Sequence, residues 1–130
     1  MKLLLDTHVL VWSRLEPERL SPEALDAMGG RDAEIWLSPI SLWEILVLTG
    51  KGRLTLEPDA ETWIRATVRD VGPVEAALTW EVAIRSRSLD VEGADPADRF
   101  LAATAEVYEL TLVTADANLL RGSGYSSLRA

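Results

Sequence analysis

The chain has 130 residues, of which 48% are hydrophobic and 26% charged, an ordinary composition for one folded domain spanning residues 1–130. It has no cysteine, which excludes disulfides and thiolate metal sites and leaves oxygen atoms and the single histidine, His8, as possible metal ligands. The formal net charge of −8 argues against binding of nucleic acid through a broadly basic face.

The apolar segments of the chain are all short. The first apolar run, residues 3–5, is too short for a secretory signal, and no segment reaches the ~20 apolar residues of a membrane span. The absence of cysteine fits a reducing compartment. We therefore expect a cytoplasmic protein that makes no use of a membrane.

The N-terminal half is expected to alternate between strands and helices. In chain order its elements are a strand over 3–5, a helix from Val9 that ends before Pro17, a helix from Pro22 to Gly29, a strand over 35–37 and a helix from Ser41 to Gly50. The helix that begins at Pro22 is expected to place Leu25 and Met28 inward, because these two residues lie on one helical face.

The C-terminal half continues the alternation. Its expected elements are a helix from Asp59 through Val68, a weak strand over 74–76, a helix over 79–88, a helix beginning at Asp95-Pro96 and a last strand over 111–114, followed by Asp116. Short apolar strands between helices predict an α/β fold, in which a mostly parallel sheet is covered by helices on both faces. Such sheets place their ligand sites beyond the carboxyl ends of the strands.

Four acidic residues are expected to converge at that edge of the sheet: Asp6, Glu44, Asp98 and Asp116. Asp6 follows the first strand directly, and Asp116 follows the strand over 111–114 in the same way. Four like charges at close range repel one another unless a cation lies among them. Mg²⁺ or Mn²⁺, which prefer oxygen ligands, is the cofactor that such a set predicts.

Each acid also has a purely structural explanation. Glu44 completes a Ser41-x-x-Glu44 capping box, in which the glutamate accepts a hydrogen bond from the backbone of the cap residue. Asp95 has the position of a helix N-cap, the interpretation that we favour for it. Asp6 and Asp116 are also explained by turn or cap formation. The four acids together favour a site more strongly than any one of them does.

Neighbouring polar residues are auxiliary candidates. Thr114 and Asn118 flank Asp116, where they would orient the carboxylate or a water, although turn formation explains them as well. Arg99 is expected to pair with the acids or to contact phosphate or a partner. His8 receives no catalytic role, since a lone histidine is more often a packing residue. Core packing is the default expectation for the tryptophans, with base stacking by one of them as an alternative that nothing in the sequence supports: Trp12, Trp36, Trp43, Trp63 and Trp80. Two interpretations stay open for the scattered basic residues, local positive potential for a nucleic-acid backbone or solvated surface charge without a function: Lys51, Arg53, Arg85, Arg87 and Arg121.

Five segments, "LLLDTHVLVW", "SPISLWEI", "GKGRLTL", "DPADRFLAATA" and "LVTAD", together resemble the PIN-domain family, and within it the VapC-type ribonuclease toxins of toxin–antitoxin pairs. The resemblance spans residues 2 to about 120. It implies a three-layer α/β/α sandwich with an acidic Mg²⁺ or Mn²⁺ site that hydrolyses RNA. The four acids of the family fall on Asp6, Glu44, Asp98 and Asp116, with Asp95 as an auxiliary residue.

The resemblance also implies partners, namely an RNA substrate, a cognate VapB-type antitoxin and a second copy in a homodimer. Two departures concern RNA positioning: many relatives have a histidine shortly before the "DPADR" segment, where this chain reads "VEGA", and a lysine at the position of Leu48. Two other functions stay open, a catalytically silent PIN-like binding module and a receiver-type phosphoacceptor domain. The second is disfavoured because no lysine follows Lys51.

Overall fold

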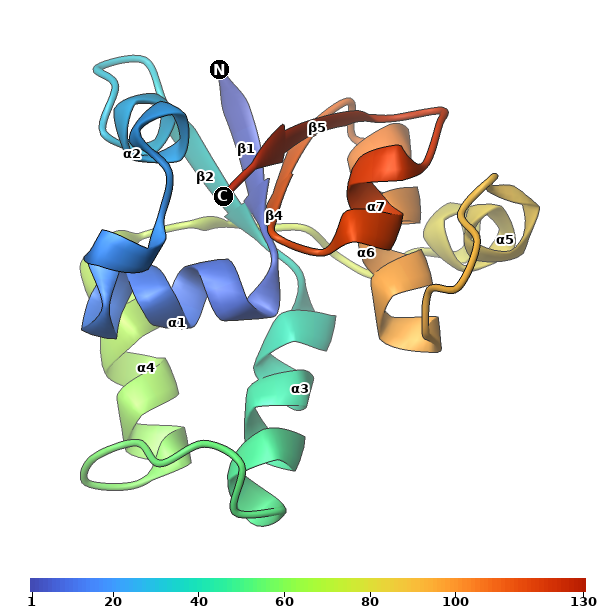
Figure 1. Ribbon diagram of the computed structural model, residues 1–130. Helices are drawn as coiled ribbons and strands as arrows, with labels where there is room; N and C mark the ends of the chain where they lie inside the picture. Colours follow the sequence, from blue (N-terminus) through green and yellow to red (C-terminus); the bar gives the residue numbers. More distant parts are fainter.

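A parallel sheet of five strands forms the centre of the computed structural model, which describes residues 1–130. The strands lie in the order β3-β2-β1-β4-β5, and every neighbouring pair is parallel. Their bounds are β1 Lys2–Leu5, β2 Glu34–Leu37, β3 Val74–Glu75, β4 Thr111–Thr114 and β5 Ser126–Arg129. Figure 1 shows the sheet between two groups of helices.

Seven α-helices connect and cover the strands. Their bounds are α1 Thr7–Leu15, α2 Pro22–Met28, α3 Pro39–Gly50, α4 Ala60–Val71, α5 Trp80–Ser88, α6 Pro96–Val107 and α7 Ala117–Arg121, and a short 3₁₀ turn at Pro17–Arg19 follows α1. Most begin at a polar cap of the expected type; Asp59, for example, accepts a hydrogen bond from the Thr62 amide at 2.8 Å. None of the helices combines the length and the hydrophobicity that crossing a bilayer requires.

Two hydrophobic cores lie on the opposite faces of the sheet. Because successive residues of a strand point to opposite faces, Leu3 and Leu5 of β1 join one core while Leu4 joins the other. The first core packs against α1, α2, α3 and α4, and the second against α5, α6 and α7, as Figure 1 shows on either side of the strands. The predicted three-layer α/β/α sandwich is confirmed.

The strand order reverses between β1 and β4. From β1 the chain builds outward through β2 and β3, and it then returns to the other side of β1 to form β4 and β5. Sheets of this kind bind ligands in the crevice at such a reversal, beyond the carboxyl ends of the strands. Leu5 pairs with Val113 across the two strands, so Asp6, which follows β1, lies beside Thr114, the last residue of β4.

The start of α3 differs from the prediction. The helix begins at Pro39, and Ser38 is its N-cap, with its hydroxyl accepting a hydrogen bond from the Ile40 amide at 3.1 Å. Proline at the first helical position is already set for the helix, which explains why this earlier start wins. Ser41 therefore lies inside the helix, and the capping-box interpretation of Glu44 is wrong.

Three further predictions were wrong in detail. The strand over 111–114 is not the last, because β5 follows it and pairs with β4 as an edge strand. Leu25 of α2 is 43% exposed, and Ala24 is the residue of that helix that the core buries. Two tryptophans expected in the core are exposed instead, Trp43 and most strongly Trp80, which is 90% exposed.

Candidate active site

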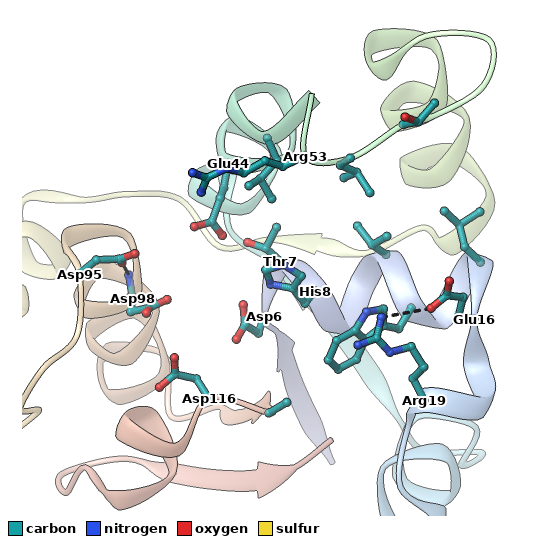
Figure 2. Close-up of a pocket in the computed structure, with 17 residues that line it drawn as sticks. Asp6, Thr7, His8, Glu16, Arg19, Glu44, Arg53, Asp95, Asp98 and Asp116 are labelled. Atoms are coloured by element: carbon teal, nitrogen blue, oxygen red, sulfur yellow. Dashed lines mark hydrogen bonds and ion pairs between the residues drawn. The ribbon is translucent and has the colours of Figure 1, made fainter. Parts of the chain in front are cut away.

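A cavity of about 840 Å³ lies beyond the carboxyl ends of β1 and β4. Besides Glu16, which pairs with Arg19, five carboxylates line it: Asp6, Glu44, Asp95, Asp98 and Asp116. They come from the end of β1, from α3, from the start of α6 and from the turn after β4. Figure 2 shows Asp95, Asp98 and Asp116 on one side of the cavity, with Asp6 and Glu44 facing them. The fold thus brings together all four acids that the sequence singled out.

Asp6 is the most deeply placed of these acids, with 7% of its surface exposed. It occupies the N-cap position of α1, yet its side chain makes no capping hydrogen bond. Its Oδ2 instead accepts a hydrogen bond from the Thr114 hydroxyl at 2.6 Å. Burial raises the pKa of Asp6, while the Thr114 hydrogen bond and the neighbouring His8 act in the opposite direction. Turn formation alone therefore does not account for Asp6.

Asp116 serves as the N-cap of α7 and also lines the cavity. Its Oδ1 accepts hydrogen bonds from the backbone amides of Asn118 and Leu119 at 2.8 and 3.1 Å. Its other oxygen, Oδ2, accepts no hydrogen bond from the protein. The capping explanation is thus correct, and it leaves one carboxylate oxygen available to a ligand.

Asp95 and Asp98 occupy the first turn of α6. Asp95 is the N-cap, and its Oδ1 accepts a hydrogen bond from the Asp98 amide at 2.8 Å, as the sequence predicted. Burial raises the pKa of Asp98 to about 8, helped by the charges of Asp95, Asp6, Asp116 and Glu44. All four neighbouring acids therefore add to the effect of burial on Asp98.

The auxiliary residues have different positions. Thr114 links two acids, since its hydroxyl donates to Asp6 and accepts a hydrogen bond from the Asp116 amide at 3.0 Å. The Asn118 side chain lies on the wall of a separate cavity and accepts a hydrogen bond from Arg121, so it does not reach the acids. Arg99 contacts no acid either, and its guanidinium donates to three backbone carbonyls, those of Ser86, Leu89 and Val91, at 2.8, 3.0 and 2.6 Å.

The cavity wall also contains residues that the sequence did not single out for this place. Thr7 is 1% exposed, and its buried hydroxyl has no hydrogen-bond partner. His8, Trp12, Arg19 and Arg53 also line the wall. One signal was visible in the sequence, because His8 and Trp12 are one turn apart on the helix that begins after Asp6.

The chemistry of the donor set fits a hard divalent cation. The acids offer carboxylate oxygens only, and the pKa of Asp98 is raised first by burial and then by like charges that a cation would compensate. No three His, Asp or Glu side chains are already arranged as a metal-binding group. The acids therefore fit an ion that retains bound waters between itself and some ligands, as Mg²⁺ commonly does, or that draws the side chains closer.

Comparison with known proteins places this chain in a family. The family model of the PIN domain matches residues 3–124. The chain is 35% identical to Ribonuclease VapC22 of Mycobacterium tuberculosis over 120 residues, which cover 90% of this chain and 88% of that protein.

Solved structures agree on the fold. In VapBC2 from Rickettsia felis bound to a promoter DNA fragment, a chain with 16% identity matches with a TM-score of 0.74, covering 99% of this chain and 98% of that one. A chain of DNA-bound VapBC from Salmonella typhimurium matches with a TM-score of 0.64 at 18% identity, covering 99% and 98%. With the matches to the PIN-domain model and to Ribonuclease VapC22, the chain belongs to the PIN-domain family and, within it, to the VapC-type toxins.

Proposed function

We propose that this protein is a metal-dependent endoribonuclease, the toxin of a VapBC-type pair, and that it hydrolyses phosphodiester bonds of RNA. One observation carries the proposal: acids from four separate segments line a single cavity at the point where the strand order reverses. Folding would not favour such crowding of like charges without a compensating ligand. The 35% identity to a protein named as a ribonuclease supports RNA as the substrate.

Asp6, Glu44, Asp98 and Asp116 are the residues that would hold Mg²⁺ or Mn²⁺. A bound divalent ion supplies an activated water and compensates negative charge on the phosphate and the leaving oxygen. The protein's own part is to fix the acids. Thr114 holds Asp6 by its hydroxyl, and the amides of α7 hold one oxygen of Asp116, so both carboxylates are oriented before any ligand arrives. The products proposed from the family resemblance carry a 5′-phosphate and a 3′-hydroxyl.

Cleavage of RNA by the purified protein tests the proposal. We expect activity with Mg²⁺ or Mn²⁺, none in EDTA, and recovery when the metal is restored. Asp6→Asn and Asp116→Asn should each lower the rate by several orders of magnitude, because each removes a charged ligand while keeping the shape of the side chain. Arg65→Ala, an exposed change on α4 far from the cavity wall, serves as the control. Full activity in either acid variant would contradict the assignment.

We also propose two protein partners, a VapB-type antitoxin and a second copy of the chain. VapBC complexes among the structural relatives support the first. Exposed apolar side chains on α5 support the second, since Trp80 is 90% and Ile84 65% exposed. Light scattering of the purified protein measures its molar mass and so tests the second proposal. We expect the mass of a dimer, and a larger share of monomer in Trp80→Ser. A monomer at all concentrations would contradict it.

The alternative functions make different predictions. A catalytically silent PIN module would bind its partners but would give no heat of Mg²⁺ binding in calorimetry. A functional metal site would give such heat in the wild-type protein, and Asp6→Asn would abolish it. A receiver-type phosphoacceptor would be labelled on an aspartate by a small phosphodonor, and we expect no label. The unrelieved charge around Asp98 favours the metal-dependent enzyme over both.

A further inference from the structure

The cavity that holds the acids has a second end with a different character. Away from Asp98 and Asp116 its wall includes the flat or basic side chains of His8, Trp12 and Arg19, together with Glu16. Figure 2 shows Arg19 beyond His8, on the opposite side of the cavity from Asp116. At about 840 Å³ the cavity is within the range of roughly 300–1,000 Å³ that holds small organic ligands, and far larger than an ion needs.

These three side chains stack on one another. The guanidinium of Arg19 lies over the Trp12 ring, with Cζ 4.3 Å from the ring centroid. The His8 and Trp12 rings are tilted by 47°, and their centroids are 5.9 Å apart. An ion pair with Glu16 at 3.2 Å helps to hold Arg19 in place. We refer to His8, Trp12 and Arg19 as the stacking platform.

The platform has a fixed position relative to the acids. Its two rings belong to α1, which begins directly after Asp6, so helix geometry places Trp12 roughly 9 Å along the axis from that carboxylate. Trp12 also packs against the first hydrophobic core, which prevents α1 from moving independently. A nucleotide adjoining a phosphate at the acids would therefore meet the platform without rearrangement of the protein.

We propose that the stacking platform binds one unpaired base of the RNA strand next to the cleaved phosphate, and that Arg53 faces a neighbouring backbone phosphate. The proposal rests on the ribonuclease function and extends it to substrate positioning. Unpaired bases stack on aromatic rings and on arginine guanidinium planes, the two kinds of surface present here. Because the net charge is −8, these local cations also offset the repulsion that RNA would otherwise meet.

The charges of the platform favour a nucleotide over a peptide. Arg19, whose guanidinium lies over the Trp12 indole, and Arg53 are both exposed cations on the wall of the cavity that holds the acids. A nucleotide supplies both a flat ring and an anion, whereas an acidic peptide supplies the anion alone. Binding of an antitoxin segment at the platform is the competing outcome that the experiment must separate.

Binding of RNA can be measured without cleavage in the Asp116→Asn background with Mg²⁺. The probe is a short fluorescein-labelled single-stranded RNA of mixed sequence, together with a series in which one base at a time is replaced by an abasic sugar. We expect Trp12→Ala to weaken binding of the intact RNA roughly five- to hundredfold, the value of one stacked base. Replacing one particular base by an abasic sugar should weaken binding by a similar factor. Trp12→Ala combined with that abasic RNA should lose no more affinity than either change alone.

Other variants separate stacking from charge. Trp12→Phe should bind within a few-fold of the background protein, which also guards against a folding defect in Trp12→Ala. Arg19→Lys keeps the positive charge but removes the flat guanidinium. It should therefore bind the intact RNA more weakly, but bind equally well the RNA whose stacked base has been replaced by an abasic sugar. Arg53→Ala should weaken all RNAs alike and lower the salt dependence of binding by about 0.7. Arg65→Ala is the matched control, because Arg65, like Arg19, pairs with a glutamate nearby in the sequence, and it should change nothing.

Each remaining outcome has one meaning. One outcome is that Trp12→Ala weakens binding of every abasic RNA by the same factor as binding of the intact RNA, and another is that it weakens none of them. Either result would overturn the stacking platform while leaving the ribonuclease function intact. Loss of antitoxin binding in Trp12→Ala with unchanged RNA binding would identify a protein-docking surface and would also overturn it. Absence of Mg²⁺-dependent cleavage by the wild-type protein would overturn the ribonuclease function itself.

Discussion

The Thr114 hydroxyl joins the two acids that follow neighbouring strands, donating to Asp6 Oδ2 at 2.6 Å and accepting from the Asp116 amide at 3.0 Å. The parallel pairing of Leu5 with Val113 places it there, since residue 114 is the first position of β4 beyond the end of β1. A single hydroxyl thus sets the orientation of one acid and the backbone of the other.

Thr114→Val keeps the shape of the side chain and removes both hydrogen bonds. We expect the free energy of unfolding to fall by about 1–3 kcal/mol, because Asp6 is left buried without a donor. The RNA cleavage rate should fall roughly 10- to 100-fold, the usual effect of losing a residue that orients a metal ligand. Thr114→Ser should restore most of both quantities. Equal activity of the valine and serine variants would argue against this role of the hydroxyl.

The stability of the metal-free protein should decrease as pH rises. The pKa of Asp98 is about 8 in the folded protein and about 3.9 in an unfolded chain, so between these values the folded state retains a proton that the unfolded state releases. The free energy of unfolding therefore falls across this window, and the raised pKa of Asp6 acts in the same direction. Melting in EDTA at about pH 5 and about pH 8 measures the effect.

The variant Asp98→Asn provides the matching control, because it cannot take part in this proton uptake. Its melting temperature should depend less on pH than that of the wild-type protein. A wild-type melting temperature that rises between about pH 5 and pH 8 would contradict the assignment, as would an unchanged slope in Asp98→Asn.

Metal should stabilise the wild-type protein more than a variant in which Asp98 has lost its charge. In EDTA near pH 8, Asp98→Asn should be more stable than the wild-type protein, because it removes a charge from the crowded group. Mg²⁺ should stabilise the wild-type protein by about 2.7 kcal/mol at a hundred times its Kd, and the variant by less. The same shift in both proteins, measured by thermal melting, would exclude Asp98 as a ligand.

Arg99 should contribute to stability. Its guanidinium donates to the carbonyls of Ser86, Leu89 and Val91, and so ties α6 to the end of α5 and to the segment that follows it. Arg99→Ala should lower the free energy of unfolding by about 2–4 kcal/mol in urea, and Arg99→Lys should recover little, since an ammonium cannot reach three divergent carbonyls. The exposed change Arg65→Ala should stay within about 0.5 kcal/mol. Equal unfolding midpoints for Arg99→Ala and the wild-type protein would contradict this.

Local patterns were enough to predict the parts of this structure that depend on neighbouring residues. Asp6 and Asp116 were found because each ends a short apolar strand, and parallel strands bring such ends to one edge. The start of α3 was mistaken because Ser38-Pro39 and Ser41-x-x-Glu44 are both valid caps, and only the path of the chain decides between them. The strand β5 was missed because "SSLR" has a single apolar residue, and its pairing with β4 supplies what the pattern lacks.

The stacking platform could not be predicted from local sequence patterns alone. The spacing of His8 and Trp12 is visible in a helix, but Arg19 comes from the turn that begins at Pro17. Its position over the indole depends on the reversal of the chain after α1, which no local pattern records. The exposure of Trp80 has the same origin, since burial of an amphipathic helix depends on which neighbour it meets.

Asp95 and Asp98 should respond differently to the same change, because their oxygens do different things. Asp95 caps α6, and asparagine caps a helix almost as well, so Asp95→Asn should keep cleavage within a few-fold and Asp95→Ala should cost about 1 kcal/mol of stability. Asp98 makes no such cap and is the acid on which the charges of the others act, so Asp98→Asn should abolish cleavage. Cleavage rates and urea unfolding midpoints of the three variants measure this difference. If Asp95→Asn abolished cleavage and Asp98→Asn did not, Asp95 would take the role assigned here to Asp98.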